Sequence, residues 1–162
     1  MFRHDNITDN YGSEDQLYLR IDKFIPKNKI IYEPFYLDGK SGECLKNMNC
    51  KKIIHQDIDF FTNVDKLDFD IIVSNIPFSK RRDIFNKLFE VDKPFIIACL
   101  PGVLSCKWFL EKYGNKNLQL IIPHTRSKCY NPDFNKKNYT PPHGMYYYCY
   151  KMQFETDLNF IE

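Results

Sequence analysis

The ten residues DIIVSNIPFS, from Asp70 to Ser79, join an apolar β-branched run to a polar and aromatic ending. The run predicts a buried strand over residues 69–74. The ending, Asn75-Ile76-Pro77-Phe78, has groups suited to an amine attached to an aromatic ring, as in adenine. The Asn75 side-chain carbonyl and the Ile76 backbone carbonyl can accept both amine hydrogens, which favours a pyramidal and more nucleophilic nitrogen, while Phe78 stacks on the base. The alternative is a strand-ending turn in which Asn75 caps the backbone and Phe78 packs on the core.

A second segment with chemical potential is EPFYLDGKSG, from Glu33 to Gly42. It places an acid at the end of a predicted strand and two glycines, Gly39 and Gly42, before a predicted helix. Glycines allow a ligand to approach the backbone, and a helix start offers free N–H groups. The spacing is not GxGxxG, so an ordinary strand–helix turn explains this segment equally well.

A third segment follows the next predicted strand, where Asp57 and Asp59 occur. An acid about 20 residues after a glycine-containing turn is what nucleoside-binding α/β folds use to hold ribose hydroxyls. The alternative is that these carboxylates are solvated loop residues.

The elements that must position these segments alternate along the chain. We predict a first helix from an N-cap at Ser13 to Pro26, and parallel strands covered by helices on both faces. The late strands follow one another without a helix, which predicts an antiparallel far edge. The chain is therefore expected to be one small doubly wound α/β domain over residues 1–162. The predicted strands are 29–32, 51–55, 69–74, 94–100, 118–122, 126–130 and 145–152, and the later predicted helices are 43–48, 80–89 and 103–112.

Composition narrows the class of protein. Of the 162 residues, 43% are hydrophobic and 27% are charged, which is typical of a globular domain, and the net charge of +2 permits a nucleic-acid partner without requiring one. The six cysteines form no CxxC pair, so we expect reduced thiols and no metal site. No apolar run approaches the ~20 residues of a membrane span, and the N-terminus lacks a secretion signal. We therefore expect a soluble, intracellular protein without a membrane partner.

The order of the three segments resembles that of the amino-methyltransferases that depend on S-adenosylmethionine (SAM). That family has a D/E-P-F-x-G-x-G turn and an (N/D)-P-P-(Y/F) motif, and the resemblance runs from Tyr11 to Met152. HQDIDFF, which begins at His55, and KPFIIACLP, which begins at Lys93, resemble the adenine-N6 branch. The resemblance implies a class I Rossmann-like methyltransferase fold, SAM as the cofactor, and methyl transfer to N6 of adenine in DNA or RNA.

The resemblance also implies roles for individual residues. Asn75, Ile76, Pro77 and Phe78 would line the target amine, and Asp57 would bind the SAM ribose or else Asp59 and Phe60 would flank its adenine. The remaining residues implied to contact SAM are Glu33, Pro34, Phe35, Gly39 and Gly42 in the turn, and Tyr11 and Gly12 in a loop that closes over it.

Two departures from the family pattern weaken the predicted site, and a third concerns the architecture of the sheet. Leu37 stands where the family has its first turn glycine, and Ile76 stands at the first motif proline. Ile76 keeps the needed carbonyl but loses the rigidity of proline, although Pro77 still favours an extended shape. The stretch between Asp57 and Phe69 is too short for a helix–strand–helix unit, so we expect one αβ unit to be missing.

A nucleic-acid substrate would need an unpaired or flipped base and contacts to its backbone. The basic candidates are Lys80, Arg81 and Arg82 after the motif, and Arg126 and Lys128 later in the chain; a solvated basic patch is the alternative. A chain of this length leaves no room for a target-recognition domain, so sequence specificity is expected to be low or supplied by a partner subunit.

Two other functions compete with adenine methylation. The same four-residue motif also serves methylation of a glutamine amide in proteins. A non-enzymatic module or accessory subunit with a degenerate methyltransferase fold is supported by Leu37 and Ile76. The second alternative is opposed by the joint presence of five residues, because a dead site has no physical reason to keep them together: Glu33, Asp57, Asn75, Pro77 and Phe78.

Overall fold

A computed structural model describes residues 12–131, 136–139 and 143–162 of the chain. The described residues form a seven-stranded sheet of order β10-β6-β9-β5-β4-β2-β3 and a separate three-stranded sheet of order β1-β7-β8. Tyr11, predicted to contact the cofactor, lies outside the described residues.

The large sheet is mostly parallel, as the sequence predicts. Strands β3, β2, β4 and β5 pair in parallel, and β9 pairs antiparallel with both β5 and β6, toward the edge that the sequence predicts to turn antiparallel. The carboxyl ends of β2, β3 and β4 therefore meet at one edge of the sheet. The strands are β2 (Ile30–Tyr32), β3 (Lys52–Ile54), β4 (Ile71–Asn75), β5 (Phe95–Cys99), β6 (Leu118–Pro123), β9 (Tyr146–Tyr150) and β10 (Leu158–Ile161).

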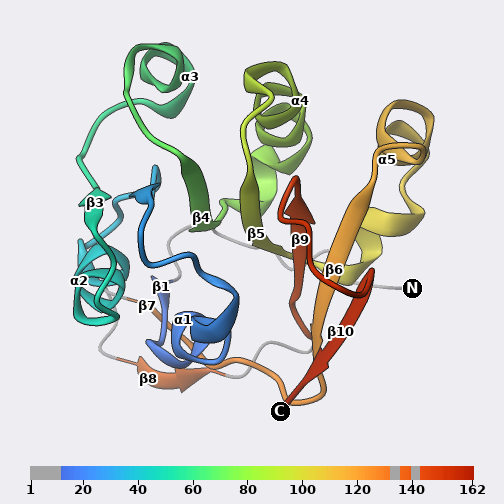
Figure 1. Ribbon diagram of the computed structural model, residues 1–162. Coiled ribbons are helices and arrows are strands. Elements are labelled where there is room, and N and C mark those ends of the chain that lie inside the picture. Colours follow the sequence, from blue (N-terminus) through green and yellow to red (C-terminus); the bar gives the residue numbers. More distant parts are fainter. Residues whose placement is uncertain (1–11, 132–135, 140–142) are drawn as a thin grey trace.

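Helices cover both faces of this sheet (Figure 1). One face is covered by α1 (Gln16–Leu19) and α2 (Lys40–Asn47), and the other by α3 (Phe60–Asn63), α4 (Arg81–Val91) and α5 (Lys107–Tyr113). Short 3-10 helices occupy Asp22–Phe24, Val64–Lys66, Phe78–Lys80 and Pro101–Ser105. None of the helices in the described part of the chain is long and apolar enough to cross a membrane.

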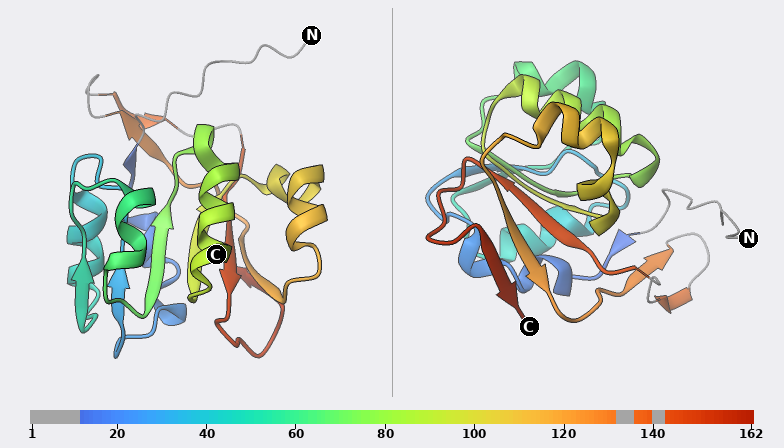
Figure 2. Two further views of the ribbon diagram at one scale, coloured as in Figure 1. Left: turned by 90° about the horizontal axis from the view of Figure 1, so that it is seen from above. Right: turned by 90° about the vertical axis from the view of Figure 1, so that its right-hand side faces the viewer.

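The small sheet consists of β1 (Gly12–Ser13), β7 (Cys129–Asn131) and β8 (Lys136–Tyr139), all antiparallel. In the left view of Figure 2 it lies beyond one end of the strands of the large sheet. Its first strand corrects the predicted helix start: Ser13 pairs with Cys129, so α1 begins only at Gln16. The loop predicted after residue 130 likewise contains β8.

The edge strands of the large sheet are β3 and β10. No strand occurs between β3 and β4, where the chain forms only α3 and a 3-10 turn, and β3 is an edge strand. This agrees with the predicted loss of one αβ unit. At the opposite edge, β10 pairs in parallel with β6 and was not predicted, so the sheet still has seven strands.

The core is split by the sheet into two apolar clusters, one beneath each layer of helices. Phe85 of α4 is fully buried in the cluster under α3, α4 and α5, and its ring lies 5.3 Å from those of Phe109 and Tyr148, centroid to centroid. Edge-on ring pairs of this kind add to the stability gained by burial. Phe85 thus connects two helices to the sheet.

We predict that Phe85→Ala lowers the free energy of unfolding by about 3–5 kcal/mol, because it leaves a cavity among several aromatic rings. Phe160→Ala is the matched control, since Phe160 is 71% exposed on β10 whereas Phe85 is 0% exposed. Urea denaturation of the two variants measures the difference. Equal losses would contradict the assignment of Phe85 to the centre of the core.

Candidate functional site at the carboxyl edge of the sheet

The carboxyl end of β2 is marked by a buried acid, Glu33, which is 1% exposed. Its Oε2 accepts a hydrogen bond from the Tyr18 hydroxyl at 2.7 Å, and its Oε1 accepts from the Ser74 hydroxyl at 2.5 Å and from the Phe35 N–H at 3.1 Å. Tyr18 belongs to α1 and Ser74 to β4. One carboxylate therefore joins a helix, two neighbouring strands and the turn that follows β2.

The backbone of Glu33 extends this connection to β3. Its N–H donates to the Ile54 carbonyl at 3.0 Å, and its carbonyl oxygen lies 2.8 Å from His55 Nδ1. Because a carbonyl can only accept, Nδ1 must carry the proton. Burial lowers the pKa of His55 and outweighs the opposing effect of the hydrogen bond to Glu33. His55 is therefore a neutral side chain that ties the end of β3 to the end of β2.

The carboxyl group of Glu33 is difficult to ionise. Burial raises its pKa from 4.5 to about 7, and the hydrogen bonds from Ser74, Tyr18 and the Phe35 N–H reduce the rise. A buried acid with a pKa near neutrality, at the end of the sheet where doubly wound folds generally bind ligands, marks a candidate functional position.

The turn after Glu33 has an unusual backbone. Leu37 has φ of +45° and Gly39 has φ of +84°, so both residues are in the left-handed region. Glycine enters this region freely, whereas a residue with a Cβ pays about 1–2 kcal/mol. Leu37 stands where the family pattern has a glycine, and the structure gives a reason for glycine at that position. The Leu37 side chain is exposed at the surface of the turn.

The stacked rings of Tyr36 and His55 connect the turn to the end of β3. Tyr36 stacks on His55 with centroids 4.8 Å apart, and the Gly39 N–H donates to the Tyr36 carbonyl at 2.7 Å. Gly42 is buried in α2, where a Cβ would come within 2.2 Å of His55 Cδ2. Gly42 thus has a packing role against His55, and its contact with a cofactor stays a prediction.

The motif after β4 is partly core and partly surface. Asn75 ends β4 in register with Ala98 of β5, at the same edge of the sheet as Glu33. The Ile76 side chain is 2% exposed and belongs to the cluster under α3, α4 and α5. That Ile76 makes the motif less rigid than a proline would stays a prediction, and its side chain packs in the core. Pro77 precedes a 3-10 turn, and the half-buried Phe78 packs against both clusters.

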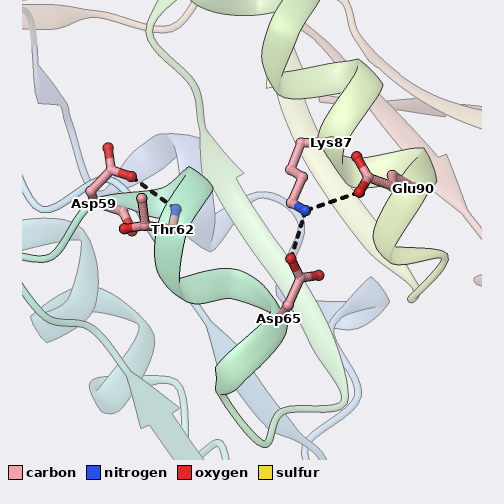
Figure 3. Close-up of polar contacts among 5 residues, drawn as sticks. All are labelled: Asp59, Thr62, Asp65, Lys87 and Glu90. Atoms are coloured by element: carbon pink, nitrogen blue, oxygen red, sulfur yellow. Dashed lines mark hydrogen bonds and ion pairs between the residues drawn. The ribbon is translucent and has the colours of Figure 1, made fainter.

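The acids after β3 have separate surroundings. Asp57 is exposed, and Asp59 is the N-cap of α3, with its Oδ1 accepting from the Thr62 N–H at 2.9 Å (Figure 3). Phe60 is 3% exposed and its ring lies 5.4 Å from that of Phe35, so it is a core residue here. Of the predicted cofactor residues in this segment, Asp57 and Asp59 are the ones with free surface.

Figure 3 also shows how the segment that contains Asp59 is held against α4. Lys87 of α4 donates to Asp65 at 2.6 Å and to Glu90 at 3.2 Å. Asp65 belongs to the 3-10 turn that follows α3. The short β3–β4 connection is therefore fixed to the helix that follows the Asn75 motif.

The basic residues divide into a structural one and exposed ones. Arg81 Nη1 donates to the Phe78 carbonyl at 2.7 Å, so Arg81 orders the turn after the motif. Lys80 and Arg82 are exposed at the start of α4, and Arg126 and Lys128 are exposed between β6 and β7. The end of β6 lies at the same edge as the ends of β4 and β5, because β6 and β5 both run antiparallel to β9.

Four residues that organise this edge were not predicted from the sequence: Tyr18, His55, Ser74 and Tyr130, whose hydroxyl donates to Asp38 Oδ2 at 2.8 Å. Gly12, which was predicted, lies beside Tyr130, where a Cβ would come within 2.4 Å of the ring. The described residues contain no group of three or more His, Cys, Asp or Glu able to hold a metal ion.

Comparison with known proteins establishes the fold. No family model and no curated protein matches the sequence. A crystal structure from Pyrococcus horikoshii, described as a "putative RNA methyltransferase", matches with a TM-score of 0.50 and 15% identity, covering 82% of this chain and 78% of that one. The chain has a Rossmann-like methyltransferase fold.

We predict that Leu37→Gly raises the free energy of unfolding by about 1 kcal/mol, because it removes the left-handed strain at an exposed position. The matched control is Leu19→Gly in α1. The two leucines are 48% and 49% exposed, but glycine in a helix costs stability. Chemical denaturation should therefore give shifts of opposite sign. A loss of stability in both variants would contradict the strain at Leu37.

We predict that the stability difference between wild type and Glu33→Gln depends on pH. The folded-state pKa of about 7 lies above the ordinary 4.5. The stability that protonated Glu33 contributes is therefore fully present below pH 4.5 and is lost as the pH rises through 7. The glutamine does not titrate. Relative to the variant, the wild type should lose roughly 3 kcal/mol between pH 4.5 and pH 8.

Urea denaturation across that pH range measures this difference. Glu43→Gln, at an exposed position of α2 outside the network, is the matched control. A difference between wild type and Glu33→Gln that is constant with pH would show that Glu33 ionises normally in the folded protein.

Proposed function

We propose that this protein is a SAM-dependent methyltransferase that modifies an exocyclic amine, most specifically N6 of adenine in DNA or RNA. The observation that carries the proposal is the Ser74–Glu33 hydrogen bond of 2.5 Å. It joins the strand that ends in Asn75 to the strand that ends in the candidate cofactor turn. In this proposal, the residues after β4 that would hold the amine and the turn that would hold SAM are thereby kept side by side, and the fold resembles that of a methyltransferase.

The residues at this edge suit SAM. The exposed turn formed by Tyr36, Leu37 and Asp38 follows a buried acid, and the left-handed Gly39 begins α2. Such strand–helix turns at a sheet's carboxyl edge are the ligand-binding positions of doubly wound folds. In this proposal the Glu33 turn, Gly39 and Gly12 hold SAM, Asp57 or Asp59 contacts its nucleoside, and SAM supplies an electrophilic methyl group.

The target amine would be held by the residues after β4. Asn75 Oδ1 and the Ile76 carbonyl accept the two amine hydrogens, and the Phe78 ring stacks on the base. The buried Ile76 side chain replaces the rigidity that a proline gives at this position, because packing fixes the backbone on which the carbonyl sits. Arg81 supports the same geometry through its hydrogen bond to the Phe78 carbonyl.

A nucleic-acid substrate is supported by two observations. Lys80, Arg82, Arg126 and Lys128 are exposed around the edge that holds Asn75, where they would contact phosphates. The structural neighbour is itself described as an RNA methyltransferase of uncertain assignment. Because adenine N6 is paired within a duplex, the substrate in this proposal is a single strand or a flipped base. A partner subunit would then supply sequence specificity.

One observation favours a second function, that of a non-catalytic binding module. Leu37 places an exposed side chain in the candidate cofactor turn, at the position where the resembled family pattern has a glycine. Binding of SAM without methyl transfer to adenine-containing nucleic acid would support this function over the enzyme.

The test is transfer of a labelled methyl group from SAM to adenine-containing single strands. We predict that Asn75→Ala lowers the rate about 100-fold, because loss of one positioned polar group in an active site has effects of this order. Calorimetric SAM affinity should change less than twofold. Asn115→Ala, at an exposed position between α5 and β6, is the control and should keep the wild-type rate.

Two outcomes would contradict the proposal. Equal rates for wild type and Asn75→Ala would refute the role of Asn75. Failure of the wild type to bind SAM at millimolar concentration would refute the enzyme itself.

A further inference from the structure

We infer that Tyr130 is a positioning residue that clamps the candidate cofactor turn in its ligand-binding shape. The inference rests on the proposed function, in which residues 36–39 hold SAM. Tyr130 lies on β7 of the small sheet, about 90 residues along the chain from the turn, and its hydroxyl donates to Asp38 Oδ2 at 2.8 Å. The small sheet is thereby attached to the turn itself.

The contact has a second component through Lys40, the first residue of α2. Lys40 Nζ lies 3.3 Å from Asp38 Oδ2 and 4.2 Å from the centroid of the Tyr130 ring. The Lys40 N–H also donates to Asp38 Oδ1 at 3.2 Å. Tyr130, Asp38 and Lys40 therefore form a closed set of contacts in which each member touches the other two.

Within the small sheet, the Tyr130 ring packs closely against Gly12. Gly12 of β1 pairs with Tyr130 of β7, and a Cβ on Gly12 would come within 2.4 Å of Tyr130 Cζ. The absence of a side chain at Gly12 leaves the space that the Tyr130 ring occupies. This gives a structural reason for the glycine that the sequence analysis assigned to a loop over SAM.

The protonation states of Tyr130 and Asp38 favour the hydrogen bond between them. Burial is the largest cause that raises the pKa of Tyr130, and the hydrogen bond and charge of Asp38 raise it further, so the hydroxyl stays a donor. Burial alone would raise the pKa of Asp38, but the hydrogen bonds from Tyr130 and Lys40 lower it overall. Asp38 is therefore an ionised acceptor, and hydrogen bonds to charged groups are the stronger ones.

The turn needs such a clamp because of Leu37. This residue is held at φ of +45°, next to Asp38, and without a restraint the turn would relax toward ordinary dihedral angles. A ligand that requires the strained shape would then have to restore it on binding, at a cost in affinity. The clamp is expected to matter less when residue 37 is glycine, which adopts the left-handed region freely.

The first measurement needs no ligand. We predict that Tyr130→Phe speeds amide hydrogen exchange at Gly39 and Lys40, whose N–H groups are bonded within the turn. Tyr150→Phe is a matched control, because Tyr150 donates to Asp92 at 2.8 Å and Lys151 contacts the same acid at 2.7 Å. That second set of contacts lies near the amino end of β5, away from the carboxyl ends of the strands where the candidate turn lies. It should leave exchange at Gly39 and Lys40 unchanged.

The second measurement is calorimetric SAM affinity. Tyr130→Phe should raise the Kd roughly three- to tenfold, and Tyr150→Phe less than twofold. In a Leu37→Gly background the effect of Tyr130→Phe should shrink to less than twofold, since the strain that the clamp opposes is gone.

The outcomes separate the clamp from the proposed function. Unchanged exchange in Tyr130→Phe, or equal changes in Tyr130→Phe and Tyr150→Phe, would overturn the clamp. An affinity loss that is the same with Leu37 and with Gly at position 37 would overturn its link to strain. If the wild type binds no SAM, the proposed function fails, and the exchange result still decides whether Tyr130 holds the turn.

Discussion

The structure of this edge depends on one buried carboxylate. Glu33 is removed from water, and such a group is tolerated only when hydrogen-bond donors replace the lost hydration. Tyr18, Ser74 and the Phe35 N–H supply three such bonds. Each donor comes from a different part of the chain, so satisfying one acid requires α1, β4 and the turn after β2 to be placed together. These bonds do not fully offset the cost of burying a charge, and the pKa of Glu33 is therefore raised.

The same requirement organises the two halves of the candidate site. The Ser74 bond aligns the end of β4 with the end of β2, while the Glu33 backbone holds His55 at the end of β3. The turn over residues 36–39 has two further contacts: Tyr36 stacks on His55, and Tyr130 donates a hydrogen bond to Asp38. The turn gains its shape from its neighbours, which explains how Leu37 is tolerated there.

The sequence predicted those elements that are determined by the pattern of residues close together in the chain. The β-branched run before Asn75 forms β4, and the parallel sheet follows from apolar strands that alternate with helices. The sequence could not reveal contacts between distant residues. The predicted helix start at Ser13 was wrong because β1 pairs with β7, more than 100 residues away. The burial of Ile76 could not be predicted either, because it depends on the whole cluster.

The central claim is that the carboxyl edge of the sheet binds SAM. A titration followed by two-dimensional amide NMR tests it directly. The account predicts the largest shifts in residues 33–42 and 74–78, with smaller shifts near Asp57. A different cavity, of about 410 Å³, lies near the amino ends of the strands and is lined in part by Phe24, Asp70 and Lys151. Shifts concentrated around that cavity, or no shifts at all, would contradict the account.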